Sequence, residues 1–227
     1  MARILVINPN SSTDCSAGIA AAVTGFRMPG GPVIDVATLL EGPPAIYSWR
    51  DWHRAVEPLC ALIERETADV YVVACASDPG IEAARAVTER PVLGVFRSAV
   101  ATATARGERF GVVAIVDASK GRHLAALRAM GLEGRLAGHV ALNVSMETLL
   151  SSASARPALE HAARTLLQQG ANSIILGCTG MAQHRRALED AVGIPVIEPC
   201  QAAVALALSF LLPSIAESSA TAEQPRA

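Results

Sequence analysis

The chain has 227 residues, a formal charge of −2 and 51% hydrophobic residues. This length allows one large α/β domain or two small ones, each with ample core. The near-neutral charge gives no basic field for nucleic acid. No apolar run approaches the ~18 residues of a membrane span, and the apolar run after Arg3 is too short for a signal peptide. We therefore expect a cytoplasmic protein that acts on a small molecule.

The cysteines, histidines and lysine bear on cofactors. Five cysteines, at positions 15, 60, 75, 178 and 200, form no CxxC pair, and without an export signal we expect them to be reduced. No His/Cys pair has metal-ligand spacing, so no structural zinc is expected. The single lysine, Lys120, lies in a predicted polar turn, which argues against pyridoxal phosphate because that cofactor needs a lysine. We expect neither a metal nor a cofactor.

Strand-like and helix-like stretches alternate along the chain. Strands are predicted over 3–7, 33–37, 70–75, 92–95, 110–116, 139–143, 173–177 and 195–197. Helices are predicted over 12–24, 51–66, 80–88, 97–106, 120–130, 146–151, 156–169, 182–191 and 200–212. This alternation is typical of a parallel α/β architecture.

The pattern also repeats at an offset of about 103 to 106 residues. The run 68–75 matches 171–178, and 91–95 matches 195–199. The repeat predicts two pseudosymmetric α/β lobes with a small-molecule site in the cleft between them. We expect 1–97 plus 200–212 to form the first lobe, 98–199 the second, and 213–227 a flexible tail. A homo-oligomer is also expected.

Two cysteines, Cys75 and Cys178, stand at equivalent ends of the repeated strands. Ligands bind at this carboxyl edge in open α/β sheets. Two thiols facing one carbon from opposite sides suit a two-base mechanism, in which one sulfur removes a proton and the other returns one. We expect the sulfurs to lie roughly 7–9 Å apart, with helix N-termini that lower the thiol pKa. A buried cysteine is otherwise an inert small hydrophobe.

Other polar residues follow the strand ends. Asn8-Pro9-Asn10-Ser11-Ser12 opens a helix whose free amides either receive an anionic oxygen or are simply capped. Ser77 is a candidate because it lies beside Cys75. Asp78 either orients a thiol or a substrate N–H, or caps the helix that starts at Gly80. His184 is interpreted as part of a solvated helix face. The remaining cysteines are assigned to packing, with a position near the cleft left open for Cys200.

These motifs together resemble the hydantoin racemase group of the aspartate/glutamate racemase superfamily. The resemblance rests on Ile4-Leu-Val-Ile-Asn8-Pro-Asn-Ser-Ser12, Gly42-Pro43, Ala74-Cys75-x-x-Asp78-Pro-Gly80 and Leu176-Gly-Cys178-Thr-Gly-Met181. It implies two lobes with the active site between them, no cofactor, and Cys75 and Cys178 as the two acid/bases. It further implies that Asn8, Thr179 and Gly180 line the site that holds the carbonyl oxygens of the substrate.

The chain departs from that pattern at three places: Ala76-Ser77 replaces the usual Phe-Gly, Ala45-Ile46-Tyr47 replaces Ser-Ile-Glu in part, and Phe96-Arg97 stands where an acid is usual. Arg97 either binds a carboxylate or ureido oxygen at the cleft mouth or lies on the surface of a first helical turn. The expected reaction is inversion of C5 of a 5-substituted hydantoin. The alternatives are an allantoin racemase, an amino-acid racemase, a maleate-isomerase-like enzyme and a non-catalytic ligand-binding protein of the same fold.

Overall fold

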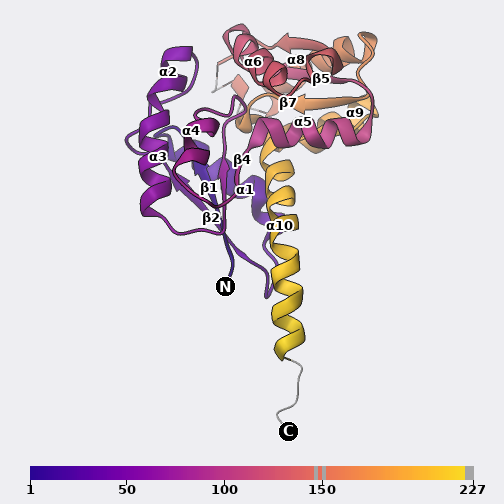
Figure 1. The fold of residues 1–227 in the computed structure, drawn as a ribbon. Coiled ribbons are helices and arrows are strands. Elements are labelled where there is room, and N and C mark those ends of the chain that lie inside the picture. The colour runs from indigo at the N-terminus through magenta and orange to yellow at the C-terminus, as the bar shows by residue number, and fades with distance from the viewer. Residues whose placement is uncertain (146–147, 150–151, 223–227) are drawn as a thin grey trace.

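A computed structural model describes residues 1–145, 148–149 and 152–222, without the side chains of 152–153 and 212–222. It contains two four-stranded sheets in which every strand pair is parallel, so the predicted α/β class is confirmed. The two sheets lie in separate parts of the molecule, with indigo and purple elements in one and pink and orange elements in the other (Figure 1).

The two sheets have the same strand order. The first runs β2-β1-β3-β4 and the second β6-β5-β7-β8. The strands are β1 (Arg3–Asn8), β2 (Val33–Thr38), β3 (Val70–Val73), β4 (Val92–Gly94), β5 (Phe110–Ala114), β6 (Leu136–Ala141), β7 (Ser173–Leu176) and β8 (Val196–Ile197). Within β3 and β7 every residue is buried, as expected for parallel strands covered on both faces. All eight strands predicted from the sequence are present, and the matching order confirms the repeat.

Helices cover both sheets. Those that follow strands of the first sheet are α1 (Thr13–Val23), η1 (Thr24–Phe26), α2 (Trp49–Arg54), α3 (Val56–Arg65) and α4 (Ile81–Ala86). Those of the second are η2 (Asp117–Ser119), α6 (Lys120–Ala129), η3 (Glu133–Arg135), α8 (Ser152–Gln168), η4 (Thr179–His184) and α9 (Arg185–Val192). Two more helices, α5 (Val95–Arg106) and α10 (Pro199–Ala222), pack against each other.

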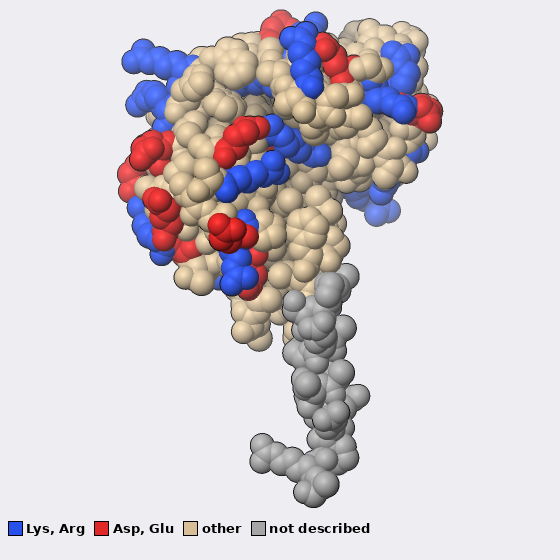
Figure 2. Space-filling view, viewed as in Figure 1, with Lys and Arg blue, Asp and Glu red and all other residues tan. Residues whose placement is uncertain are grey.

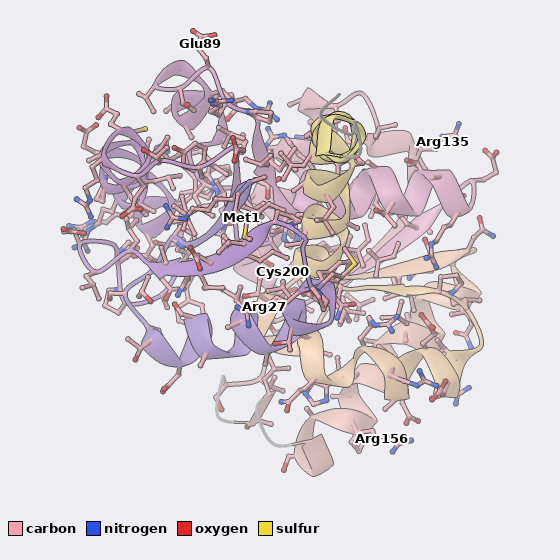
Figure 3. The ribbon with its side chains drawn as sticks, turned by 90° about the horizontal axis from the view of Figure 1, so that it is seen from below. Met1, Arg27, Glu89, Arg135, Arg156 and Cys200 are labelled. Carbon is pink, nitrogen blue, oxygen red and sulfur yellow. The ribbon has the colours of Figure 1, made fainter. Side chains whose placement is uncertain are left out.

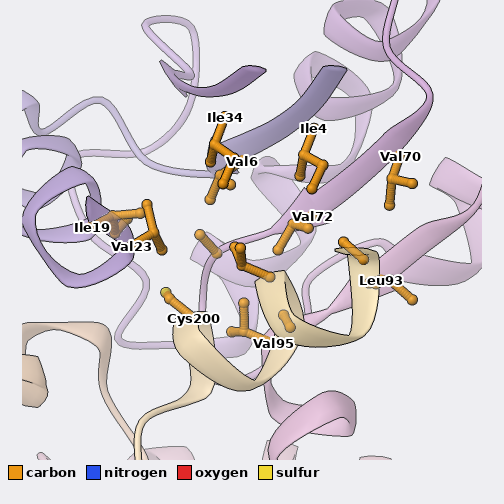
Figure 4. Packing of buried hydrophobic residues seen from close by; sticks show 14 of the residues in the cluster. Ile4, Val6, Ile19, Val23, Ile34, Val70, Val72, Leu93, Val95 and Cys200 are labelled. Carbon is orange, nitrogen blue, oxygen red and sulfur yellow. The ribbon is translucent and has the colours of Figure 1, made fainter. Parts of the chain in front are cut away.

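The buried cores account for the positions of α5 and α10. Cys200, Ala203 and Val204 of α10 pack in one cluster with Ile4 and Val72 of the first sheet (Figure 4). Helix α5 contributes Val95 to the same cluster, but most of its buried residues pack with the second sheet, in a cluster whose members include Phe96, Ala99, Val100, Phe110, Val112 and Ile175. Helix α10 thus packs on the first sheet. The lobe boundary at 97/98 itself stays a prediction.

Several helix boundaries differ from the prediction. The helix expected over 51–66 is broken at Ala55 into α2 and α3, because Pro58 has no amide hydrogen for the carbonyl four residues earlier and its ring crowds that carbonyl. The helix expected at 182 begins as the tighter η4, since the Met181 amide bonds the Cys178 carbonyl at 3.0 Å. Of the helix expected over 146–151, residues 146–147 and 150–151 lie outside the described residues.

The last helix is longer than predicted, because α10 continues past 212 to Ala222. Its final residues include alanine and glutamate, which favour helix. The rest of the predicted tail, 223–227, lies outside the described residues. Within the described part of the chain, no helix has the length and apolarity needed to cross a membrane. On the face in Figure 2, basic and acidic side chains are interspersed, in keeping with the small net charge.

Candidate active site

Cys75 and Cys178 both line one cavity of about 90 Å³. Cys75 follows β3 of the first sheet and Cys178 follows β7 of the second. The cavity is lined by Asn10, Cys15, Ala45, Ile46, Tyr47, Ala74, Cys75, Ala76, Ser77, Ile115, Val116, Ser119, Arg122, His123, Gly177, Cys178, Thr179 and Gly180. Both lobes therefore contribute to one small site, as the duplicated motif predicts. The sulfur-to-sulfur separation of roughly 7–9 Å stays a prediction.

The turn after β3 holds Cys75 at the cavity. The Ala74 amide still bonds the Ile7 carbonyl of β1 at 2.8 Å, and the Asp78 amide then bonds the Cys75 carbonyl at 2.9 Å. This closes a tight turn in which Asp78 has a positive φ of 45°. The Ser77 Oγ lies 3.4 Å from the Cys75 Sγ. Ser77 therefore lines the cavity beside the Cys75 sulfur, and its role in binding substrate stays a prediction.

The turn after β7 presents Cys178 in a similar way. The Gly177 amide bonds the Val113 carbonyl at 2.7 Å, and a Cβ on Gly177 would lie only 2.8 Å from that oxygen. Glycine therefore allows the strand end to approach β5 closely. Cys178 is the residue before η4, and Thr179 and Gly180, the first two residues of η4, both line the cavity.

The pKa values of the two thiols are raised, whereas the sequence led us to expect lowered ones. Burial raises the pKa of Cys178 to about 12; a hydrogen bond from the Gly180 amide opposes this, and the nearby Cys75 adds to it. Burial also raises the pKa of Cys75, while the Ser77 side chain and amide and the Arg122 charge act against it. Both side chains are partly exposed because they face the cavity, yet the protein around the sulfurs excludes enough water to destabilise a thiolate. The predicted lowering is therefore wrong: desolvation outweighs the amides.

Asp78 and Arg97 lie outside this cavity. The Asp78 carboxylate, 1% exposed, accepts the Phe96 and Arg97 amides at 2.8 and 2.9 Å and so caps α5. The Arg97 guanidinium pairs with Asp78 at 3.4 Å and with Glu82 at 2.6 Å. Asp78 is thus a cap, but of α5 and not of the helix at 80. Arg97, with two carboxylate partners, is not brought to the thiols.

Asn8 and Ser11 also lie away from the cavity surface. Asn8 is fully buried, and its Nδ2 donates to the Asn10 Oδ1, the Ser12 carbonyl and the Ser16 Oγ at 3.0–3.1 Å. Its amide is used to order the loop before α1, which leaves Asn10 as the loop residue that lines the cavity. The Ser11 amide bonds the Pro43 carbonyl at 3.0 Å. Ser12 caps α1 by accepting the Cys15 amide.

Sequence reasoning missed several lining residues. Cys15 was expected to pack in a helix but faces the cavity, as do Tyr47, Arg122 and His123. Arg122 and His123 lie in α6, just after β5, the counterpart of β1. The repeat therefore held a usable indication, because the segment after β5 must reach the carboxyl edge of its own sheet, just as the segment after β1 does in the first sheet.

His123 connects the two lobes as a neutral group. Burial lowers its pKa to about 3 and that of His139 to about 4. The His123 Nδ1 lies 2.9 Å from the His139 Nε2, and its ring stacks on Phe96 at 4.6 Å. A hydrogen bond to the Ala76 carbonyl fixes the remaining edge. An imidazole held this way supports the Cys75 turn and carries no charge at neutral pH.

Two further expectations need correction or narrowing. His184 is buried, not solvated, and its Nε2 lies 2.7 Å from the Leu149 carbonyl. Cys200 is fully buried in the first-lobe core, close to the boundary between the lobes when the molecule is viewed from below (Figure 3). It is not among the cavity residues. The described residues contain no group of three His, Cys, Asp or Glu side chains that could hold a metal.

Of the three departures from the family pattern, two reach the cavity. Ala76-Ser77 and Ala45-Ile46-Tyr47 line it, whereas Phe96-Arg97 does not. The residues that differ from the usual pattern thus bear directly on what the cavity accepts.

Comparison with known proteins agrees with this geometry. A family model described as Asp/Glu/Hydantoin racemase matches residues 4–207. The chain is 35% identical over 216 residues to a hydantoin racemase of Paenarthrobacter aurescens, covering 92% of this chain and 91% of that one. It is 31% identical to a hydantoin racemase of Pseudomonas sp. (strain NS671), covering 90% and 84%. An allantoin racemase structure from Klebsiella pneumoniae has a TM-score of 0.86 at 29% identity, covering 94% and 88%. This chain belongs to the Asp/Glu/hydantoin racemase family and is a racemase, an isomerase.

Proposed function

We propose that this racemase inverts the C5 centre of a 5-substituted hydantoin, with Cys75 and Cys178 as its two acid/bases. The observation that carries the proposal is that equivalent strand ends of two lobes bring both thiols to one small cavity. One sulfur, as thiolate, takes the C5 proton, and the electron pair moves into the ring to give an enolate. The other sulfur, as thiol, donates a proton to the opposite face.

The charges around the cavity favour a neutral ring over a free amino acid. Arg122 is the only formally charged side chain among the described residues that line it. An amino-acid substrate presents an ammonium as well as a carboxylate, and no described carboxylate lines the cavity to pair with that ammonium, so burying it is costly. A hydantoin presents carbonyl oxygens and N–H groups, which the Gly180 region, Ser77 and Asn10 can bond. Two relatives of this chain, at 35% and 31% identity, are hydantoin racemases, which also supports a hydantoin substrate.

Allantoin is the second candidate. It is itself a hydantoin, and the similar Klebsiella pneumoniae structure is that of an allantoin racemase. The two-thiol chemistry is the same for both, so only the substituent on C5 separates the candidates.

Proton NMR in D₂O, with chiral separation, tests the proposal over alkyl and aryl hydantoins, allantoin, aspartate, glutamate and maleate. We expect loss of the C5 proton signal together with racemisation for hydantoins, and no reaction with aspartate, glutamate or maleate. A double variant, Cys75→Ser with Cys178→Ser, provides the background of uncatalysed exchange. No exchange above that background for any hydantoin or allantoin would contradict the proposal and favour a ligand-binding protein. A preference for allantoin over every alkyl and aryl hydantoin would select the second candidate.

A further inference from the structure

Arg122 carries a positive charge in the cavity without a counterion. Its side chain is 3% exposed, and its Nη1 donates to the Tyr47 and Ala118 carbonyls at 3.1 Å each. Its buried Nε has no hydrogen-bond partner. No carboxylate of the described residues forms an ion pair with it, and Asp51 acts on it only at longer range.

This arrangement is unfavourable unless something completes it. A buried cation without a partner is destabilising, and a buried N–H without an acceptor adds to that cost. Elsewhere the same chain neutralises a half-buried arginine fully, since Arg97 has two carboxylate partners. The two bonded carbonyls hold the Arg122 guanidinium beside the cavity, so its charge is preorganised for an anionic group that forms there.

We infer that Arg122 is the cationic donor that stabilises the enolate oxygen formed when C5 is deprotonated. The inference rests on the proposed function. A thiolate accepts the C5 proton, the C–H electron pair forms the C4–C5 double bond, and the carbonyl π pair moves to the C4 oxygen. That oxygen then carries the negative charge that the thiolate held before it took the proton. Reprotonation by the second thiol restores the carbonyl, and Arg122 keeps its protons throughout.

The effect is expected on the chemical step, because the charge on the C4 oxygen appears only in the transition state and enolate. Arg122→Met should lower kcat roughly a hundredfold or more, the usual result of removing one oxyanion donor, with a much smaller change in KM. Arg122→Lys should restore part of kcat because it keeps the charge but loses the planar fork. The control is Arg128→Met on the same helix, where the arginine is exposed and paired with Glu133.

A binding measurement keeps the inference testable without turnover. The barbiturate anion is a planar enolate with ring carbonyls, and calorimetry can compare it with uncharged hydantoin. We expect Arg122→Met to weaken the binding of barbiturate at least tenfold and the binding of hydantoin only slightly. Arg128→Met should change neither affinity. Equal weakening of both ligands, or a loss confined to KM, would overturn the inference and assign Arg122 to structure. A wild-type protein that binds barbiturate through Arg122 but racemises no hydantoin would instead contradict the proposed function alone.

A separate observation concerns the space beside the cavity. A larger hollow of about 580 Å³, here called the side groove, is lined by Ser12, Asp14, Cys15, Gly18, Ala21, Ala22, Pro44, Ala45, Tyr47, Thr179, Gly180, Ala182, Gln183 and Gln201. It shares Cys15, Ala45, Tyr47, Thr179 and Gly180 with the cavity. Small side chains dominate its wall, and Asp14 is its only charged residue among the described ones.

We propose that the side groove accepts a bulky, uncharged substituent on C5. The cavity of about 90 Å³ that holds both thiols can enclose little more than the reacting ring, so a large substituent must extend outward. A third hollow, of about 160 Å³, touches the cavity only at Ser77 and Arg122. It contains the ion pairs of Arg97, which suit an apolar group poorly. This proposal also rests on the proposed function.

Two alanines on exposed helix faces give a matched test. Ala21→Leu of α1 fills the side groove, and Ala125→Leu of α6 fills the third hollow. Gly18→Leu is a second filling variant, because a Cβ there meets nothing within 4 Å. The measured quantity is the ratio of kcat/KM for 5-benzylhydantoin to that for 5-methylhydantoin.

The ratio should fall at least tenfold in Ala21→Leu and Gly18→Leu, a typical effect of excluding apolar bulk, and change less than about twofold in Ala125→Leu. A fall in Ala125→Leu alone would place the substituent in the third hollow, and an equal ratio in all variants would remove it from both. Either result overturns the proposal while leaving racemisation of hydantoins intact. Failure of the wild-type protein to racemise either compound would contradict the proposed function itself.

Discussion

The two strand ends that carry the thiols are alike in backbone and unlike in electrostatics. Cys75 and Cys178 occupy equivalent places after β3 and β7, and each sulfur is bonded by the amide two residues later. Cys75, however, also has the Ser77 hydroxyl beside it and the Arg122 charge from the opposite lobe. Cys178 has neither, and burial raises its pKa to about 12.

This difference assigns separate roles to the thiols in the resting enzyme. The position with more donors and a cation holds a thiolate more readily, so Cys75 should be the base that starts the reaction. Cys178 should start as the thiol that donates a proton. A duplicated scaffold thus supplies the symmetry that inversion needs, while side chains from the other lobe supply the asymmetry that sets the starting charges.

Removing either thiol should have the largest effect. Cys75→Ser and Cys178→Ser should each abolish net racemisation, because a hydroxyl is far too weak an acid to replace a thiolate near neutral pH. Chiral chromatography of a single-enantiomer hydantoin measures this. Cys15→Ser is the matched control, since Cys15 also lines the cavity but follows no repeated strand. Racemisation at the wild-type rate in either of the first two variants would remove the two-thiol assignment.

The next largest effect should be the change of kcat/KM with pH. The reaction needs one thiolate and one thiol, and burial raises the pKa of both groups. Below its pKa, a thiolate becomes about tenfold more abundant with each pH unit. After subtraction of the enzyme-free rate, kcat/KM should therefore rise roughly a hundredfold from pH 7 to 9. The decline should begin only where the second thiol ionises, toward pH 12. A maximum near neutral pH would mean that the thiols are more acidic than their surroundings indicate.

Alkylation rates should sharpen the comparison between the thiols. Iodoacetamide reacts with the thiolate form, so at pH 8.5 Cys75 should be modified several-fold faster than Cys178. Peptide mass spectrometry over time resolves the sites, and the buried Cys200 is an internal reference that should stay unmodified. Faster labelling of Cys178 would reverse the proposed starting charges.

Ser77→Ala should have the smallest effect. The Ser77 Oγ lies 3.4 Å from the Cys75 Sγ, and loss of one such hydrogen bond is worth about 0.5–1.5 kcal/mol, or two- to tenfold in rate. The pH profile should also shift upward, because the pKa of Cys75 loses a group that lowers it. An unchanged profile would show that the hydroxyl does not act on the sulfur.

The parts of this account that the sequence predicts are those that repeat or alternate. The apolar runs of 70–73 and 173–176 predict central strands because covered parallel strands need such runs, and the repeat predicts that both cysteines reach one cleft between the lobes. The predicted helix boundaries are less accurate where a single residue breaks a helix, as Pro58 does between α2 and α3.

Contacts between lobes could not be predicted from local sequence. Arg122 lies within a helical pattern, and only the tertiary fold brings it to Cys75. Asn8 illustrates the reverse case. As a motif residue it suggests a ligand contact, but its side-chain amide instead donates hydrogen bonds to Asn10, Ser12 and Ser16. The thiol pKa was also misjudged, since sequence reveals nearby amides but not the degree to which the fold excludes water.

The most direct test of the central claim follows proton exchange separately for each enantiomer in the two serine variants. If the thiols act on opposite faces of C5, each variant keeps one base and can exchange the C5 proton of one enantiomer only. Proton NMR in D₂O with single-enantiomer 5-benzylhydantoin should show retained exchange for opposite enantiomers in Cys75→Ser and Cys178→Ser, without net racemisation. A two-thiol mechanism would be contradicted if both variants kept exchange for the same enantiomer. It would also be contradicted if either variant kept exchange for both enantiomers.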